Sequence, residues 1–153
     1  DPANPTLGAE LAREMYNDGA DIIYGAAGKS HLGVFAAAEE LDKYAFGTDV
    51  DQAATAPEHA DVIIGSGLKR VDLAVESQIT RLAEGTWTAG VFSYGIDTEF
   101  GFGTGIAIGD TDVNQYITQS ASEVPVADEV IAKLIEAAEE TVPGRSRSKG
   151  VSF

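Results

Sequence analysis

The sequence predicts an α/β protein with a doubly wound parallel sheet, and three observations lead to this prediction. Segments with helical periodicity alternate with short runs of β-branched and aromatic residues from Asn4 to Tyr94. The connections between these segments are short, as in strand–helix–strand units. Small or polar residues follow the predicted strands, and ligands of such sheets bind at the carboxyl ends of the strands.

Each element is predicted from local signals. Asn4 can cap a helix and Pro5 fits its first turn, so the first helix begins there and ends at Gly19. Its apolar residues form one stripe at helical spacing, made of Leu7, Leu11 and Met15 with Ala12 and Tyr16. The next elements are a strand at 21–24, a helix at 30–41, strands at 44–48 and 61–64, a helix at 70–84 and a strand at 89–94. A doubly wound sheet would also have a strand just upstream of Asp1.

The second part of the chain has a different character. Residues 94–109 are rich in glycine and predict crossing segments or a hairpin, with a strand at 106–108. Helices are expected at 113–120 and, with a clear apolar face, at 126–140. We therefore expect a ligand-binding lobe over residues 1–95 that lacks its first strand, crossover segments and a C-terminal helix over residues 96–142, and a disordered basic tail over residues 143–153. The start without Met predicts a processed or excised piece.

The composition excludes several classes of function. The chain has 10 Lys and Arg against 25 Asp and Glu, a net charge of −15, which argues against nucleic-acid binding. It has no cysteine for a disulfide or thiolate metal site, and no apolar run near the roughly 20 residues of a membrane span. The acidic surface has two interpretations: an adaptation to high salt, which we favour, and an ordinary acidic protein.

Three loops follow predicted strands and are expected at one edge of the sheet: residues 25–28, 48–52 and 65–69. The carboxylate of Asp49 can accept two hydrogen bonds, as the vicinal hydroxyls of a sugar require. Lys69 is expected to open the next helix, where the macrodipole disfavours a cation, so it either serves a ligand or reaches water. Gly28 allows the backbone to approach a ligand closely. Together these residues predict a polyol-binding edge without catalytic machinery.

Neighbouring residues are expected to support this edge. Asp51 and Gln52 are predicted to shape the turn, and Val50 to point into the structure. His31, at a helix start, is interpreted as a surface or capping residue, and His59, in an acidic loop, as a solvated residue.

Other site motifs fail on spacing. Gly28-Lys29-Ser30 is similar to the end of a phosphate-binding loop, but Ile23 stands where that loop needs glycine. The acids near Asp49 lack the glycine and glutamate spacing of a calcium loop. No nucleophile–base pair is evident. We therefore expect no catalytic residue, no metal and no cofactor.

Four sequence blocks carry a family resemblance: GADIIYGAAG at 19–28, GVF at 33–35, GTDVDQ at 47–52 and SGLKRVD at 66–72. In this order they resemble the basic-membrane-lipoprotein family of ABC-transporter solute-binding proteins, to which the purine nucleoside receptor lipoproteins belong. The resemblance covers about residues 1–103 and implies one lobe of a type I periplasmic-binding-protein-like fold. It implies that Asp49 matches the family's ribose-binding aspartate, Lys69 its ribose-binding lysine and Gly28 the glycine loop of the same pocket.

The resemblance also implies a function and partners. The whole protein would bind a nucleoside, most simply a purine nucleoside, between two closing lobes and deliver it to an ABC permease. It would not be an enzyme, and it would be anchored outside the cell as a lipoprotein. The base-stacking aromatic and nearly all of the N-terminal lobe are absent here, so we expect this chain to be a soluble C-terminal lobe fragment. Two alternatives stay open: a regulator that senses a sugar or nucleoside on the same fold, and a nucleoside-processing enzyme.

Overall fold

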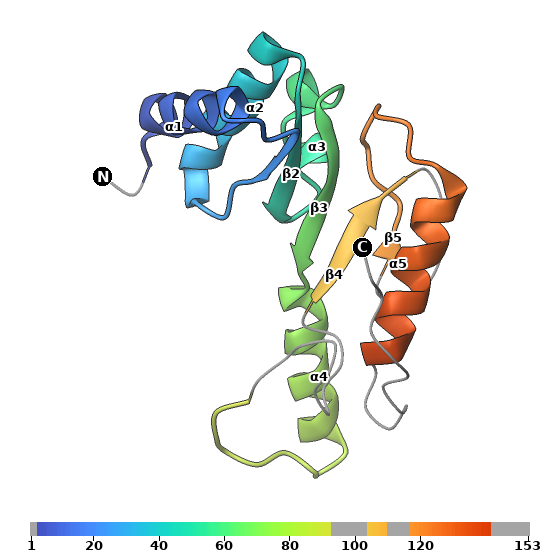
Figure 1. Ribbon diagram of the computed structural model, residues 1–153. Helices are drawn as coiled ribbons and strands as arrows, with labels where there is room; N and C mark the ends of the chain where they lie inside the picture. Colours follow the sequence, from blue (N-terminus) through green and yellow to red (C-terminus); the bar gives the residue numbers. More distant parts are fainter. Residues whose placement is uncertain (1–2, 93–103, 110–116, 142–153) are drawn as a thin grey trace.

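The computed structural model describes residues 3–92, 104–109 and 117–141 and is built on one five-stranded sheet (Figure 1). The strands lie in the sheet in chain order: β1 (Ile22–Tyr24), β2 (Tyr44–Asp49), β3 (Ile63–Lys69), β4 (Thr104–Ile108) and β5 (Ile117–Thr118). The first three are parallel, β4 runs antiparallel to β3, and β5 is parallel to β4. The sheet is therefore mostly parallel, which confirms the predicted fold class, although the antiparallel β3–β4 pair was not predicted.

The helices flank this sheet unevenly. They are α1 (Pro5–Asn17), α2 (His31–Leu41), the short α3 (Gln52–Thr55), α4 (Val71–Ala83) and α5 (Asp128–Thr141), with 3₁₀ turns at Gly28–Ser30 and Pro57–His59. Figure 1 shows α1 beside α2, α5 along β4 and β5, and α4 leading from β3 away from the sheet. The Asn4 side chain accepts a hydrogen bond from Leu7 N at 3.1 Å, so the predicted cap is confirmed.

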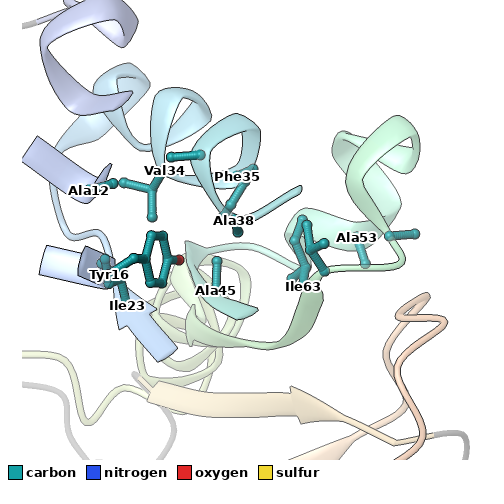
Figure 2. Packing of buried hydrophobic residues seen from close by; sticks show 12 residues of the cluster. Ala12, Tyr16, Ile23, Val34, Phe35, Ala38, Ala45, Ala53 and Ile63 are labelled. Carbon is teal, nitrogen blue, oxygen red and sulfur yellow. The ribbon is translucent and has the colours of Figure 1, made fainter. Parts of the chain in front are cut away.

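The main core lies between α1, α2 and the first three strands (Figure 2). Alanines are frequent in it, and the larger side chains are those of Tyr16, Ile23, Val34, Phe35, Val62 and Ile63. Small residues let the two helices approach closely, because a Cβ at Gly33 of α2 would run into the carbonyl oxygen of Pro5 in α1. A second cluster packs Ile108 of β4 and Ile117 of β5 against α5.

Two strand predictions and one helix prediction need correction. The strand expected at 61–64 begins at Ile63 and continues through Gly65-Ser66-Gly67 to Lys69, where we expected a loop. Pairing with β2 on one side and β4 on the other satisfies this backbone, which outweighs the local tendency of glycine to turn. Residues 89–92 form no strand, since β4 occupies the place beside β3; positions 93–94 lie outside the described residues. The helix expected at 113–120 is a strand at 117–118, because Ile117 pairs with Ile106; residues 113–116 lie outside the described part.

The apolar stripe expected on the first helix is divided in the structure. Ala12 and Tyr16 are buried, whereas Leu7, Leu11 and Met15 are about half exposed. The reason is that α1 contacts α2 through its small residues, so its long apolar side chains face outward.

Two expectations about the chain's organisation stay predictions. The proposed lobe boundary at residue 95 and the basic tail at 143–153 both lie outside the described residues. Among the helices that the structure describes, none has the length and apolar character needed to span a bilayer.

Candidate functional site

The candidate site lies at the carboxyl ends of two adjacent parallel strands. Asp49 is the last residue of β2, and Lys69 is the last residue of β3. In the register of the pair, Asp49 stands opposite Leu68, so Lys69 is one residue beyond it on the neighbouring strand. Lys69 thus ends a strand rather than opening a helix, since α4 begins at Val71. Parallel pairing brings the two charged residues to the same edge of the sheet.

A groove of about 390 Å³ opens at this edge. It is lined by Asp49, Val50, Asp51, Leu68, Lys69, Arg70, Asp72, Ala107 and Thr118. A larger groove of about 540 Å³ runs along α4, but its lining carries no charged group and is almost wholly apolar. Small-molecule sites combine apolar walls with a few convergent polar groups, so the groove at the sheet edge is the candidate site.

Three of the five charged groups that line this groove already have partners. The Asp51 carboxylate accepts hydrogen bonds from Ser120 Oγ at 2.9 Å and from the Ala121 amide at 2.7 Å. Asp72 pairs with Arg70, whose Nη2 lies 2.8 Å from Asp72 Oδ2. The hydrogen bonds from Arg70 lower the pKa of the Asp72 carboxyl, so this pair stays ionised at neutral pH.

The other two charged side chains in the groove are those of Asp49 and Lys69. In the described part of the chain, the Asp49 carboxylate and the Lys69 ammonium have no hydrogen-bond or ion-pair partner, and both residues are exposed. The groove therefore offers one free acceptor group and one free donor group on neighbouring strands.

The backbone at Asp49 is unusual. Its φ is +68°, in the left-handed region that non-glycine residues rarely enter. The amide of Val50 donates to the Thr48 carbonyl at 2.8 Å, so residues 48–50 form a γ-turn with positive φ at its centre. Such a conformation costs roughly 1–3 kcal/mol and is maintained only where the surroundings hold it. The turn leaves Val50 46% exposed, so the prediction that Val50 points into the structure is wrong.

Gly28 lies apart from this groove. It begins a 3₁₀ turn after β1 with φ +55°, is exposed, and does not line the groove. The loop before it, Gly25 to Ala27, lines a separate hollow with residues of α1. The structure thus brings Asp49 and Lys69 together, and Gly28 as a third ligand contact stays a prediction.

Arg70 and Thr118 line the groove but were not predicted as site residues. Arg70 directly follows Lys69, so its position beside the candidate lysine was a signal that could have found it. Thr118 had no such signal, because it reaches the groove only through the pairing of β5 with β4.

The interpretations of both histidines need correction. His31 is only 9% exposed, and its Nε2 lies 2.7 Å from Gln52 Oε1. The reason is that His31, at the start of α2, contacts Gln52 of the short helix α3 instead of facing solvent. His59 is hydrogen-bonded through Nδ1 to Glu39 and is not freely solvated. No group of three or more His, Asp or Glu residues within the described ranges could hold a metal ion.

Comparison with known proteins gives one family. The family model described as ABC transporter substrate-binding protein PnrA-like matches residues 3–141. This range contains the whole described structure and the candidate groove.

Curated relatives agree with this match over parts of their length. Basic membrane protein D of Borreliella burgdorferi is 44% identical over 80 residues, which are 51% of this chain and 23% of the relative. The CD4+ T-cell-stimulating antigen of Listeria monocytogenes is 37% identical over 113 residues, 65% of this chain and 32% of the relative. An uncharacterized lipoprotein of Pyrococcus abyssi is 33% identical over 96 residues, 59% of this chain and 23% of the relative. The chain thus spans about a quarter to a third of these relatives.

The solved structures that are similar to this chain include the following two. An ABC transporter solute-binding protein from Aeropyrum pernix K1 is 31% identical with a TM-score of 0.52, over 90% of this chain and 32% of that one. A transcriptional activator of the comK gene from Bacillus halodurans is 22% identical with a TM-score of 0.67, over 90% of this chain and 42% of that one. The second likeness shows the fold alone. The first agrees with the expected type I periplasmic-binding-protein-like fold.

Proposed function

Because this chain belongs to the family of PnrA-like ABC transporter substrate-binding proteins, we propose that its groove binds the ribose of a nucleoside. The family consists of binding proteins rather than enzymes, so the alternative of a nucleoside-processing enzyme is set aside. The proposed ligand is a purine nucleoside, held between this lobe and a second one.

One observation supports the proposal most directly. The Asp49 carboxylate and the Lys69 ammonium line the same groove, and in the described part of the chain neither has a hydrogen-bond or ion-pair partner. A carboxylate can accept hydrogen bonds from both vicinal hydroxyls of ribose, and an ammonium can donate to ribose oxygens. Hydrogen bonds to charged groups contribute about 1.5–3 kcal/mol each. The Asp51 and Asp72 carboxylates are occupied by protein donors, which leaves Asp49 as the acceptor for a ligand.

The wider function follows from the family. We propose that the whole protein closes two lobes on the nucleoside and delivers it to an ABC permease. The lipoprotein names of several relatives support an extracytoplasmic, membrane-anchored location. Gly28 would line the same pocket once the second lobe closes. The excess of 25 acidic over 10 basic residues supports a high-salt environment.

The test uses the full-length gene product that carries this chain and isothermal titration calorimetry. Adenosine and inosine are expected to bind, and 2′-deoxyadenosine, which lacks one vicinal hydroxyl, is expected to bind at least tenfold more weakly than adenosine. Asp49→Ala should weaken adenosine binding at least tenfold, about 1.4 kcal/mol. It should also remove most of the preference over 2′-deoxyadenosine, as expected if the carboxylate and the hydroxyl interact.

Asp61→Ala is the matched control, because Asp61 is exposed and does not line the groove. It should bind adenosine like the wild type. If the wild-type protein binds no purine nucleoside, the proposed ligand class is wrong. If Asp49→Ala binds adenosine with unchanged affinity, Asp49 is not in the site.

A further inference from the structure

A buried polar network contacts the turn at residues 48–50, which contains Asp49. It consists of Gln52, Ser66 and His31, and we call it the Gln52 network. Their exposed fractions are 8%, 0% and 9%. None of the three lines the candidate groove, so none is placed to touch a ligand there. Buried polar groups of this kind need a reason, because most buried polar atoms in folded proteins are hydrogen-bonded and leaving one without a partner costs stability.

Gln52 makes three hydrogen bonds that tie the turn to its surroundings. Its side-chain Nε2 donates to the Thr48 carbonyl at 3.0 Å, and its backbone amide donates to Ser66 Oγ in β3 at 2.9 Å. Its Oε1 lies 2.7 Å from His31 Nε2 in α2. The Thr48 carbonyl also accepts from Val50, so the same oxygen closes the γ-turn and is held by Gln52.

The contacts define the protonation of the histidine ring. Since Gln52 Nε2 donates to Thr48, the amide oxygen faces His31 and must accept from it. His31 therefore carries its proton on Nε2. Its Nδ1 is, in the described part of the chain, the buried side-chain nitrogen or oxygen that has no hydrogen-bond partner. A lone pair without a donor is tolerated more easily than a buried N–H without an acceptor, so this tautomer suits the network.

Gly47 makes room for the network in β2. A Cβ at this position would clash with Ser66 Oγ and would come within 2.6 Å of Gln52 Cβ and Cγ. The absence of a side chain at Gly47 thus leaves room for the Gln52 side chain that reaches the Thr48 carbonyl. The Gln52 network thus joins residues of four elements, β2, β3, α2 and α3, next to the turn at residues 48–50.

We propose that Gln52, oriented by His31 and Ser66, is a positioning residue that holds Asp49 in its left-handed conformation and so aims its carboxylate into the groove. The strained turn needs such support, because an aspartate at φ +68° would relax toward an extended conformation without it. The binding part of this inference rests on the proposed function, whereas the conformational part does not.

The experiment compares two pairs of variants in the full-length gene product. Gln52→Met keeps the length of the side chain but removes its donor and acceptor. Gln52→Glu keeps the acceptor for His31 but loses the donor to Thr48. In α2, His31→Leu removes the ring donor, while His31→Gln keeps a donor at a similar distance and is the conservative control.

The first readout is the conformation of Asp49 without ligand. With selectively labelled aspartate, NMR measures the three-bond HN–Hα coupling and the Cα shift of Asp49, both of which depend on φ. The wild type should show the left-handed values, and both Gln52 variants and His31→Leu should move toward extended values. His31→Gln should stay like the wild type. The ring ¹⁵N shifts of His31 should report the proton on Nε2.

The second readout is adenosine affinity by calorimetry. Gln52→Met and His31→Leu should bind at least tenfold more weakly, and His31→Gln should bind within about threefold of the wild type. Thermal unfolding of every variant shows whether it is folded; should Gln52→Met fail to fold, Gln52→Glu and the two His31 variants decide.

A wild type whose Asp49 shows extended values overturns the inference. So do folded Gln52 variants with unchanged Asp49 signals. If the wild type binds no nucleoside, the proposed function fails, and the NMR readout still judges the positioning role.

Discussion

At the scale of single residues, Tyr16 shows how a polar group can be part of the core. Its side chain lies among buried hydrophobic residues (Figure 2) and is 4% exposed. Its hydroxyl donates to the Tyr44 carbonyl at 2.7 Å. This hydrogen bond connects α1 to the start of β2. Burial raises the pKa of the Tyr16 phenol to about 12, because the phenolate would lose its hydration.

The raised pKa predicts a loss of stability at high pH. The folded state holds the Tyr16 proton up to about pH 12, whereas the unfolded chain releases it near the ordinary value of 10.0. Between these values the folded state binds more protons, so its stabilisation is complete below pH 10 and falls as the pH rises toward 12. The expected contribution is on the order of 2 kcal/mol.

Urea unfolding of the wild type and Tyr16→Phe between pH 8 and 12 measures this contribution. At pH 8 the variant should be less stable by about 1 kcal/mol, the usual value of one lost hydrogen bond. Above pH 10 the difference should shrink, because only the wild type loses stability through this group. Parallel pH curves for the two proteins would show that Tyr16 does not titrate as a buried phenol.

At the scale of elements, α4 differs from the other long helices. None of its residues belongs to either hydrophobic cluster of the described structure, and Val71, Val75, Ile79 and Leu82 are each more than half exposed. The predicted apolar stripe is present on the helix, but no other described element covers it (Figure 1). The stabilisation of α4 by tertiary packing is therefore expected to be small.

Two isoleucine truncations test this expectation. Ile63 in β3 is 0% exposed and Ile79 in α4 is 63% exposed. Ile63→Ala should cost about 2–5 kcal/mol of unfolding free energy because it leaves a cavity. Ile79→Ala should cost no more than about 0.5 kcal/mol, as at other surface positions. Both values come from denaturant unfolding of this chain. An equally large cost at Ile79 would mean that α4 is packed against another surface in solution.

At the scale of the whole molecule, charge is the dominant feature. With 25 acidic and 10 basic residues, most carboxylates have no basic side chain to pair with. The pairs in the described part, such as Arg13–Glu40 and Lys43–Asp21, are at the surface and contribute little. Repulsion between the remaining carboxylates destabilises the folded state unless salt screens it.

The net charge predicts stabilisation by salt. Raising KCl from 0.1 M to 2 M shortens the Debye length from about 10 Å to below about 3 Å. The thermal midpoint of this chain should rise by at least about 3 °C, which corresponds to roughly 1 kcal/mol at this length. A variant with Glu10→Gln, Glu14→Gln and Asp18→Asn, all exposed on or beside α1, should show a smaller rise. A midpoint that does not depend on KCl would contradict the interpretation as a salt-adapted protein.

The sequence by itself determined the order of most elements and part of the candidate site. Helices α1, α2, α4 and α5 and strands β1 and β2 were predicted because their periodicity, caps and turn residues are local. Asp49 and Lys69 were predicted to share an edge because parallel strands bring their carboxyl ends together, and they line one groove.

Only the tertiary structure decided which polar side chains are free to bind a ligand and which contacts hold them in place. The extension of β3 through Gly65-Ser66-Gly67 depends on β4, which is about 40 residues further along the chain. The hydrogen bond from Ser120 to Asp51 likewise joins residues that are 69 positions apart in the chain. The contact between the buried His31 and Gln52 joins residues that are 21 positions apart. Local sequence signals cannot report such contacts, because they arise from pairing between distant segments after the chain has folded.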